Sequence, residues 1–195
     1  MNSSKRIRLS FNAPAVLGFT FICLAVQFLN ILTKGVTNDV VFSVYRSSLL
    51  NPLTYLRCVG HVFGHADWDH LISNMMYILI LGPMLEEKYG TSNIIFVMLT
   101  TAIVTGITNM VFFPHVHLLG ASGIVFAMIL LASITSNTER TIPISFIIVA
   151  LLYIGQQVYQ GIFSHDNISQ LTHIVGGVIG STLGFIMNRC KMNRY

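Results

Sequence analysis

Long apolar stretches separated by short polar connections make up most of this chain. Six stretches contain no Asp, Glu, Lys or Arg, and they cover approximately residues 15–33, 70–85, 93–113, 119–136, 142–164 and 168–188. A bilayer crossing needs about 17–25 predominantly apolar residues, and backbone polar groups in lipid must be satisfied within the segment. The pattern therefore predicts an all-α membrane protein with a single membrane domain over residues 1–195. In this domain a short basic N-terminus, residues 1–14, precedes a bundle of six transmembrane helices.

The composition agrees with this pattern. Hydrophobic residues make up 53% of the chain and charged residues only 9%, and the mean hydropathy is +0.70. These values lie far from those of a soluble domain. We therefore expect the lipid bilayer to be the surroundings of most of the chain.

Lysine and arginine are unevenly shared between the two sides that six crossings define. Eight lie on the side of the N-terminus and three on the other. Short cytoplasmic segments carry the excess of positive charge, so both termini are predicted to be cytoplasmic, with the first span retained as a signal anchor. We expect a multi-pass protein of a cell membrane, the bacterial inner membrane. This topology explains the net charge of +4, so no nucleic-acid partner is expected.

The connection over residues 34–69 is the longest, and the topology places it outside. Most connections in compact bundles are much shorter, so this loop is predicted to have a structure of its own. The histidines also lie in outer loops or in the outer part of a span. They are His61, His65, His70, His115, His117, His165 and His173.

Three polar side chains lie at one predicted depth inside the spans. Counted from the outer ends, Ser122 is the fourth residue of its span, Asn74 the fifth and His173 the sixth. A helix rises about 1.5 Å per residue, which puts all three roughly 5–10 Å below the outer boundary. Polar groups in the membrane are costly, and many of them are functional.

Small residues provide a reason for these helices to approach closely. His173 lies one turn before a stripe of glycines at four-residue spacing, and such stripes allow membrane helices to pack backbone to backbone. The start of the span at 119–136 is equally small. The residues predicted to pack near the site are Gly120, Gly123, Gly176 and Gly180. Packing of these two spans would bring Ser122 within hydrogen-bond reach of His173.

The second predicted span adds hydrogen-bond donors. His70 and Asn74 are four residues apart and therefore share one helix face. The backbone N–H of Ser122 falls in the first turn of its helix, where it has no intrahelical partner. Together these three donors are predicted to form an oxyanion hole.

At these residues the sequence resembles the rhomboid family of intramembrane serine proteases. The resemblance comprises "GASG" with Ser122, "HLISN" with His70 and Asn74, and "HIVGGVIG" with His173, in the fourth, second and sixth spans. Three further positions match the family pattern: Arg57, Glu86 and Gly90.

Two positions depart from that pattern. Leu56 precedes Arg57 where many members have tryptophan, and Phe126 stands where bacterial members often have a tyrosine that packs on the histidine.

The resemblance implies a serine endopeptidase whose substrates are transmembrane proteins. It implies His173 as the general base and Ser122 as the nucleophile of an acyl-enzyme mechanism. The nearest acid in sequence, Asp166, lies in an outer loop, so we expect a Ser–His dyad without cofactor or metal. Substrate access between the second and fifth spans is implied. Gln156 and Gln157 in the fifth span either serve that path or bond to neighbouring helices.

Two other classes of function are weighed against this one. The first is a catalytically inactive rhomboid-like protein that binds and escorts membrane clients. The second is a metal-dependent hydrolase that uses His61, His65 and His70. It is disfavoured because "HADWDH" is not the H-E-x-x-H pattern. In the protease, His61 and His65 are expected to help hold water near the site.

Overall fold

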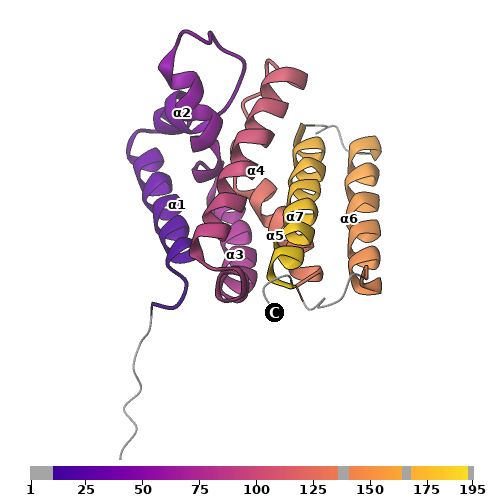
Figure 1. Ribbon diagram of the computed structural model, residues 1–195. Coiled ribbons are helices and arrows are strands. Elements are labelled where there is room, and N and C mark those ends of the chain that lie inside the picture. The colour runs from indigo at the N-terminus through magenta and orange to yellow at the C-terminus, as the bar shows by residue number, and fades with distance from the viewer. Residues whose placement is uncertain (1–10, 136–140, 164–167, 193–195) are drawn as a thin grey trace, which may run out of the picture.

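The computed structural model describes residues 11–135, 141–163 and 168–192, and this part of the chain is all-α. A π-helical turn, η1 (Asn38–Phe42), and a 3₁₀ turn, η2 (His61–Phe63), lie in the long outer loop. The α-helices are α1 (Pro14–Leu32), α2 (Pro52–Gly60), α3 (Trp68–Tyr89), α4 (Thr91–Phe112), α5 (Ser122–Ser133), α6 (Ile144–Phe163) and α7 (Ile168–Met192) (Figure 1).

Each predicted span corresponds to one helix, and the bounds agree within four residues. The segments Pro14–Leu32, Thr91–Phe112 and Gln170–Arg189 are long and apolar enough to cross a membrane. The apolar segments of α5 and α6 are shorter, Ser122–Ser133 and Ile144–Tyr159. The chain is therefore a multi-pass integral membrane protein of all-α class, while the count of six crossings stays a prediction.

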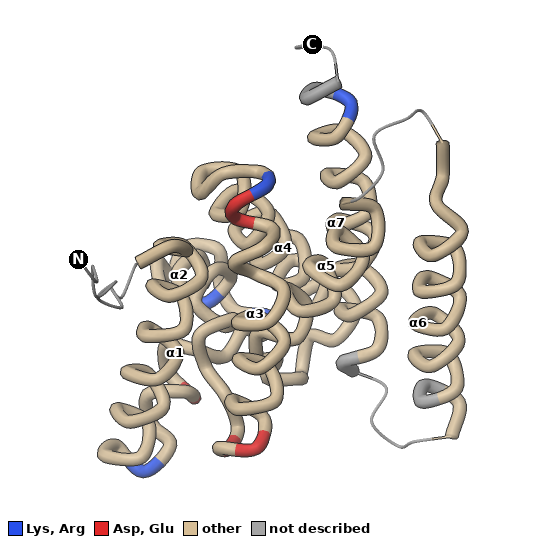
Figure 2. The backbone as a smooth tube through the Cα atoms, turned by 90° about the horizontal axis from the view of Figure 1, so that it is seen from below, with Lys and Arg blue, Asp and Glu red and all other residues tan. Residues whose placement is uncertain are grey.

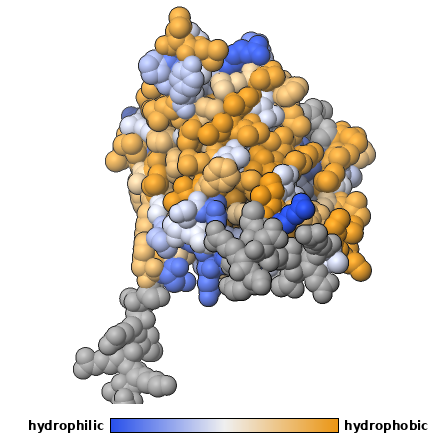
Figure 3. Space-filling model, viewed as in Figure 1, coloured by the Kyte–Doolittle hydropathy of each residue, from blue (hydrophilic) through white to orange (hydrophobic). Residues whose placement is uncertain are grey.

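The surface has the polarity of such a protein. Hydrophobic residues form a broad band around the visible face, with hydrophilic residues above and below it (Figure 3). The charged residues gather near the ends of helices and in the connections (Figure 2). Many large apolar side chains of the helices are exposed, among them Phe21, Phe96 and Leu151. When such side chains face lipid instead of water, their exposure has no hydrophobic cost.

Helix α3 extends four residues beyond the predicted end of its span, because Glu86 has partners inside the protein. Its carboxylate accepts hydrogen bonds from the backbone N–H groups of Ala15 and Val16, at 2.9 and 3.0 Å, and from the Thr91 hydroxyl at 2.8 Å. The N–H groups in the first turn of a helix lack intrahelical acceptors and favour a negative charge. Glu86 thereby fixes the start of α1 against the end of α3.

The predicted structure of the outer loop is also present. The Nε of Arg57 donates to the carbonyl of Val40 at 2.8 Å, and the guanidinium lies 4.6 Å from the centre of the Tyr45 ring. Val44 forms an isolated antiparallel bridge with Leu118. The loop is therefore tied to the segment that leads into α5.

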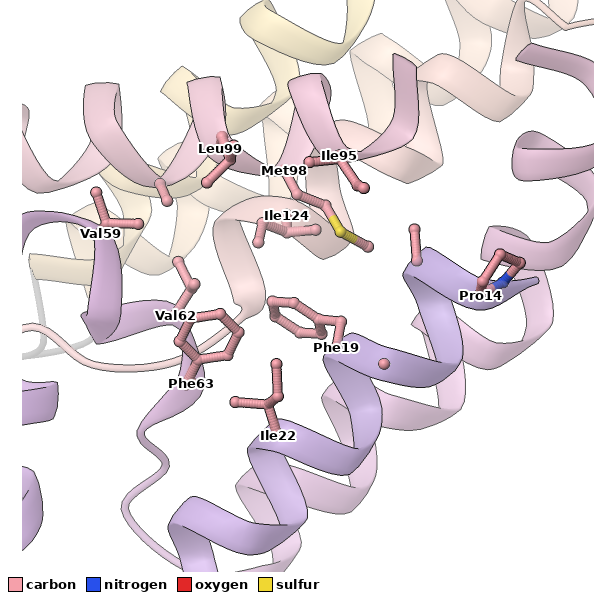
Figure 4. A pocket seen from close by; sticks show the side chains of 13 residues that line it. Pro14, Phe19, Ile22, Val59, Val62, Phe63, Ile95, Met98, Leu99 and Ile124 are labelled. Carbon is pink, nitrogen blue, oxygen red and sulfur yellow. The ribbon is translucent and has the colours of Figure 1, made fainter. Parts of the chain in front are cut away.

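The short helix α5 is central. It packs against α3, α4, α6 and α7, whereas α6 stands at the edge of the bundle against α7 and α5 (Figures 1 and 2). An apolar pocket of about 270 Å³ opens among α1, α4 and the α2–η2 segment, where Phe19, Phe63 and Met98 are among the lining residues (Figure 4). Ile124 of α5 also lines it, so the bundle is not completely filled beside the start of α5.

Candidate active site

Helix α5 begins at Ser122, three residues later than predicted. Gly120 has a φ of +127°, a conformation that side-chain-bearing residues rarely adopt. A Cβ at Gly120 would also lie 2.7 Å from the His70 ring. The extended approach through Gly120 therefore places Ser122 in the first turn of α5, where backbone N–H groups have no intrahelical acceptor.

Two buried histidines of the outer loop hold this approach in place. The carbonyl of His61 accepts the N–H of Gly120 at 2.9 Å, and the Nε2 of His65 accepts the N–H of Ala121 at 3.4 Å. Both ring nitrogens of His61 are engaged within the protein, Nδ1 with the Cys58 carbonyl and Nε2 with the Thr105 hydroxyl. The Nδ1 of His65 is engaged with the Phe63 carbonyl.

Neither His61 nor His65 lines the cavity over Ser122. The expectation that they help hold water there is therefore not met, and they anchor the loop instead. A metal site on His61, His65 and His70 would have to break the hydrogen bonds of the first two. The described residues contain no group of three or more His, Cys, Asp or Glu side chains arranged to hold a metal.

Ser122 and His173 are in hydrogen-bond contact. The Nε2 of His173 lies 2.8 Å from the Ser122 hydroxyl oxygen, and its Nδ1 lies 2.9 Å from Oε1 of Gln157. The ring of Phe126 packs on the imidazole, with 4.5 Å between the ring centres. The imidazole is thus held by contacts with α5 and α6. Asp166 lies outside the described residues.

The glycine stripe makes this contact possible. A Cβ at Gly176 would collide with the backbone of Gly123, and one at Gly180 would collide with the backbone of Ala127. Gly123 itself has Thr105 of α4 against its other side, 3.2 Å from a Cβ placed there. Helices α5 and α7 therefore approach backbone to backbone, as small residues permit in membrane proteins.

The predicted oxyanion residues line one cavity with the serine. A cavity of about 630 Å³ is bounded by His70, Asn74, Ser122 and His173 together with residues of α3 and the 113–121 connection. The Nδ2 of Asn74 is buried and has no hydrogen-bond partner. Buried donors are normally paired, so this amide nitrogen has a donor capacity that the described residues leave unused.

Sequence reasoning did not foresee the partner of His173. The sequence allows Gln157 either a role in the substrate path or a bond to a neighbouring helix, and in the structure it bonds to His173 of α7. The available signal was a carboxamide in an apolar helix, which in a membrane needs a partner. The loop-anchoring contacts of His61 and His65 depend on long-range geometry and had no signal of their own.

The chain is similar in sequence to known proteins. The family model described as "Rhomboid domain" matches residues 52–190. The chain is 28% identical over 163 residues to Rhomboid-related protein 2 of Mus musculus, covering 73% of this chain and 54% of that protein. It is 29% identical over 174 residues to Rhomboid protease GluP of Bacillus subtilis, covering 83% and 33%.

Rhomboid protease GlpG of Yersinia pestis is 25% identical over 181 residues, covering 88% of this chain and 62% of that protein. The chain thus spans between about a third and three fifths of the length of these relatives.

Proposed function

Because the Rhomboid domain matches most of its length, this chain belongs to the rhomboid family, and we propose that it is an intramembrane serine endopeptidase. Its substrates are other membrane proteins, which it cleaves in their transmembrane segments. The observation that carries the proposal is the 2.8 Å contact between the Ser122 hydroxyl and Nε2 of His173, at a cavity.

The reaction is acyl transfer. Nε2 of His173 takes the hydroxyl proton while Oγ of Ser122 attacks the substrate carbonyl carbon, and a tetrahedral intermediate forms. His173 then gives that proton to the departing amine as the peptide C–N bond breaks. Water attacks the resulting acyl-enzyme, with His173 again as the base, and releases the second product.

The negative oxygen of the tetrahedral intermediate needs donors in place before it forms. The unpaired Nδ2 of Asn74 supports this role, as do the imidazole of His70 in the same cavity and the N–H of Ser122 in the first turn of α5. The positive end of the α5 dipole acts in the same direction. Donors aimed at charge that develops only in the transition state raise kcat.

The substrate has to expose a peptide bond in this cavity. A bond within a regular helix is protected by its own hydrogen bonding, so segments that unwind easily, with glycine, proline or small residues at the cut, are preferred. The family suggests access between α3 and α6, the second and fifth spans. Six crossings with both termini in the cytoplasm would open the cavity toward the outside of a cell membrane.

The second candidate function, an inactive protein that escorts membrane clients, requires no reactive serine.

The decisive experiment incubates the purified protein with a model transmembrane substrate and compares it with Ser122→Ala and His173→Ala, with and without a chelator. We expect cleavage that both substitutions abolish and the chelator leaves unchanged. Cleavage by Ser122→Ala would refute the proposal, and binding without cleavage by the parent would favour the escort.

A further inference from the structure

A buried glutamine stands behind the imidazole that contacts Ser122. Only 2% of Gln157 is exposed, although it belongs to a largely apolar helix. Its Oε1 is 2.9 Å from Nδ1 of His173. A carboxamide oxygen accepts hydrogen bonds and cannot donate them, so Nδ1 carries the proton in this contact.

This contact decides which tautomer faces the serine. A neutral imidazole has one N–H and one bare nitrogen. With the proton held on Nδ1 by Gln157, the lone pair of Nε2 is directed at the Ser122 hydroxyl, 2.8 Å away. That tautomer is the one a general base needs, and the opposite tautomer would present an N–H to the serine.

Helix α6 supplies a second support for the same ring. The ring centres of Tyr153 and Phe126 are 4.4 Å apart, and Phe126 in turn packs on His173 at 4.5 Å. Tyr153 also limits the space at Gly177 of α7, where a Cβ would lie 3.0 Å from its ring. Gln157 holds His173 directly and Tyr153 holds it through Phe126. Both of these supports therefore depend on the position of α6.

The position of α6 rests on few neighbours. Among the described residues, α7 and α5 are the helices that it packs against most, and it stands at the edge of the bundle in both views (Figures 1 and 2). Its outward face carries the large exposed side chains Leu151, Leu152 and Tyr159. Movement of α6 away from α7 would break the bond between Gln157 and Nδ1 and leave the tautomer of His173 unselected.

We propose that Gln157 is a positioning residue for His173. The Ser122–His173 dyad is then part of a hydrogen-bonded Ser–His–Gln triad that is competent only while α6 is packed on α7. The inference rests on the proposed protease function and deepens it. Gln157 does not touch the substrate. It orients the base, and it makes the reactivity of Ser122 depend on a helix at the edge of the bundle.

The test measures cleavage of a model transmembrane substrate as kcat and KM over a range of pH. Gln157→Met keeps the length and removes the acceptor, so kcat should fall by about 10- to 100-fold, which is less than the about 10²–10⁴-fold of losing the base itself, with little change in KM. Gln157→Glu keeps the acceptor and adds a charge that favours the protonated imidazole. Its kcat should stay within several-fold of the parent, and the acidic limb of its profile should move to higher pH.

The matched control is Gln156→Met, the same change at the neighbouring position, whose side chain is exposed. We expect it to retain the parent's kcat and pH profile. The other titratable groups that line the cavity, Asp67, His70, Tyr77 and His117, are the same in every variant, and thermal unfolding verifies that each variant is folded.

The outcomes separate this inference from the proposed function. If the parent does not cleave, the protease proposal itself fails. If the parent cleaves and Gln157→Met retains its kcat, the positioning role is wrong. The positioning role is equally wrong if Gln157→Met and Gln157→Glu lower kcat by the same factor and neither moves the acidic limb of the pH profile. Packing alone would then explain the loss.

Discussion

Small side chains control what can approach Ser122. Gly120 and Gly123 stand on either side of it, and the first of them leaves room for the His70 ring while the second accepts α4 and α7. A larger residue at either position would separate the hydroxyl from the groups around it. At the scale of single residues, the site therefore depends on the absence of a Cβ atom at these two glycines as well as on its polar side chains.

The unpaired amide of Asn74 gives the sharpest expectation for a single residue. Asn74→Ala should lower kcat by about 10²–10³-fold and change KM little, because one donor to an oxyanion is lost only in the transition state. Steady-state cleavage of a transmembrane substrate measures both constants. A rise in KM at constant kcat would instead place Asn74 in ground-state binding.

The loop histidines predict a pH dependence of stability. Burial, with a smaller contribution from nearby His70, lowers the pKa of His65 to about 4, and burial lowers the pKa of His61 to about 4. The unfolded chain, with values near 6.5, binds more protons between these limits. Stability is therefore complete above about pH 6.5 and falls as the pH drops toward 4.

Thermal unfolding of the protein in detergent between pH 7.5 and 5 tests this expectation. The Tm of the parent should fall across that interval. His65→Gln should start from a lower Tm, because a buried contact is changed, and should show a shallower decline. Parallel declines in parent and variant would contradict the assignment.

The residues around Ser122 differ in how visible they are in the sequence. Ser122, Asn74 and His173 were predicted to meet because each is a polar group at one depth of an apolar span, and the structure brings them to one cavity. Gln157 was assigned no definite role, because the direction of a side chain on α6 depends on how that helix rotates against α7. Such rotation is set by packing and not by hydropathy.

At the scale of elements, apolar length determines the helices that face lipid and says little about the others. The bounds of α1 and α4 follow the apolar runs closely, since a helix in lipid must extend through the whole run. By contrast, α2, η1 and η2 are short and are held by tertiary bonds such as Arg57 to Val40. The late start of α5 likewise follows from the bonds of His61 and His65, which hydropathy does not encode.

We expect a glycine-to-alanine substitution to have opposite effects on stability inside and outside the contact between α5 and α7. Gly180→Ala forces a Cβ into the backbone of Ala127, so it should destabilise the protein by about 1–3 kcal/mol and reduce cleavage. Gly18→Ala in α1 meets nothing within 4 Å and should leave stability equal or raised by up to about 1 kcal/mol. Denaturant unfolding of the two variants compares them. Equal effects of the two substitutions on stability would mean that α5 and α7 are not in close contact at Gly180.

At the scale of the whole molecule, charges and apolar surface define an orientation. Lys34 lies just beyond the end of α1. Lys88 lies in the last turn of α3, which Glu86 bonds to the start of α1, so the two lysines lie at opposite ends of α1. If the positive-inside distribution governs insertion, Lys88 faces the cytoplasm and Lys34 the outside.

Cysteine accessibility tests that orientation. In a background without the three native cysteines, a membrane-impermeant thiol reagent added to intact cells should modify Lys34→Cys and leave Lys88→Cys unmodified until the membrane is permeabilised. The reverse pattern would invert the topology and put the cavity on the cytoplasmic side. Modification of both in intact cells would be inconsistent with a closed span between them.

The most direct measurement of the central claim is the site of covalent modification by a fluorophosphonate in the membrane-embedded protein. Peptide mass spectrometry should find one phosphonyl group, on Ser122, in the parent, and His173→Ala should lose it because the hydroxyl then has no base. An unmodified Ser122 in a parent that cleaves substrate, or equal modification in His173→Ala, would contradict a serine nucleophile activated by that histidine.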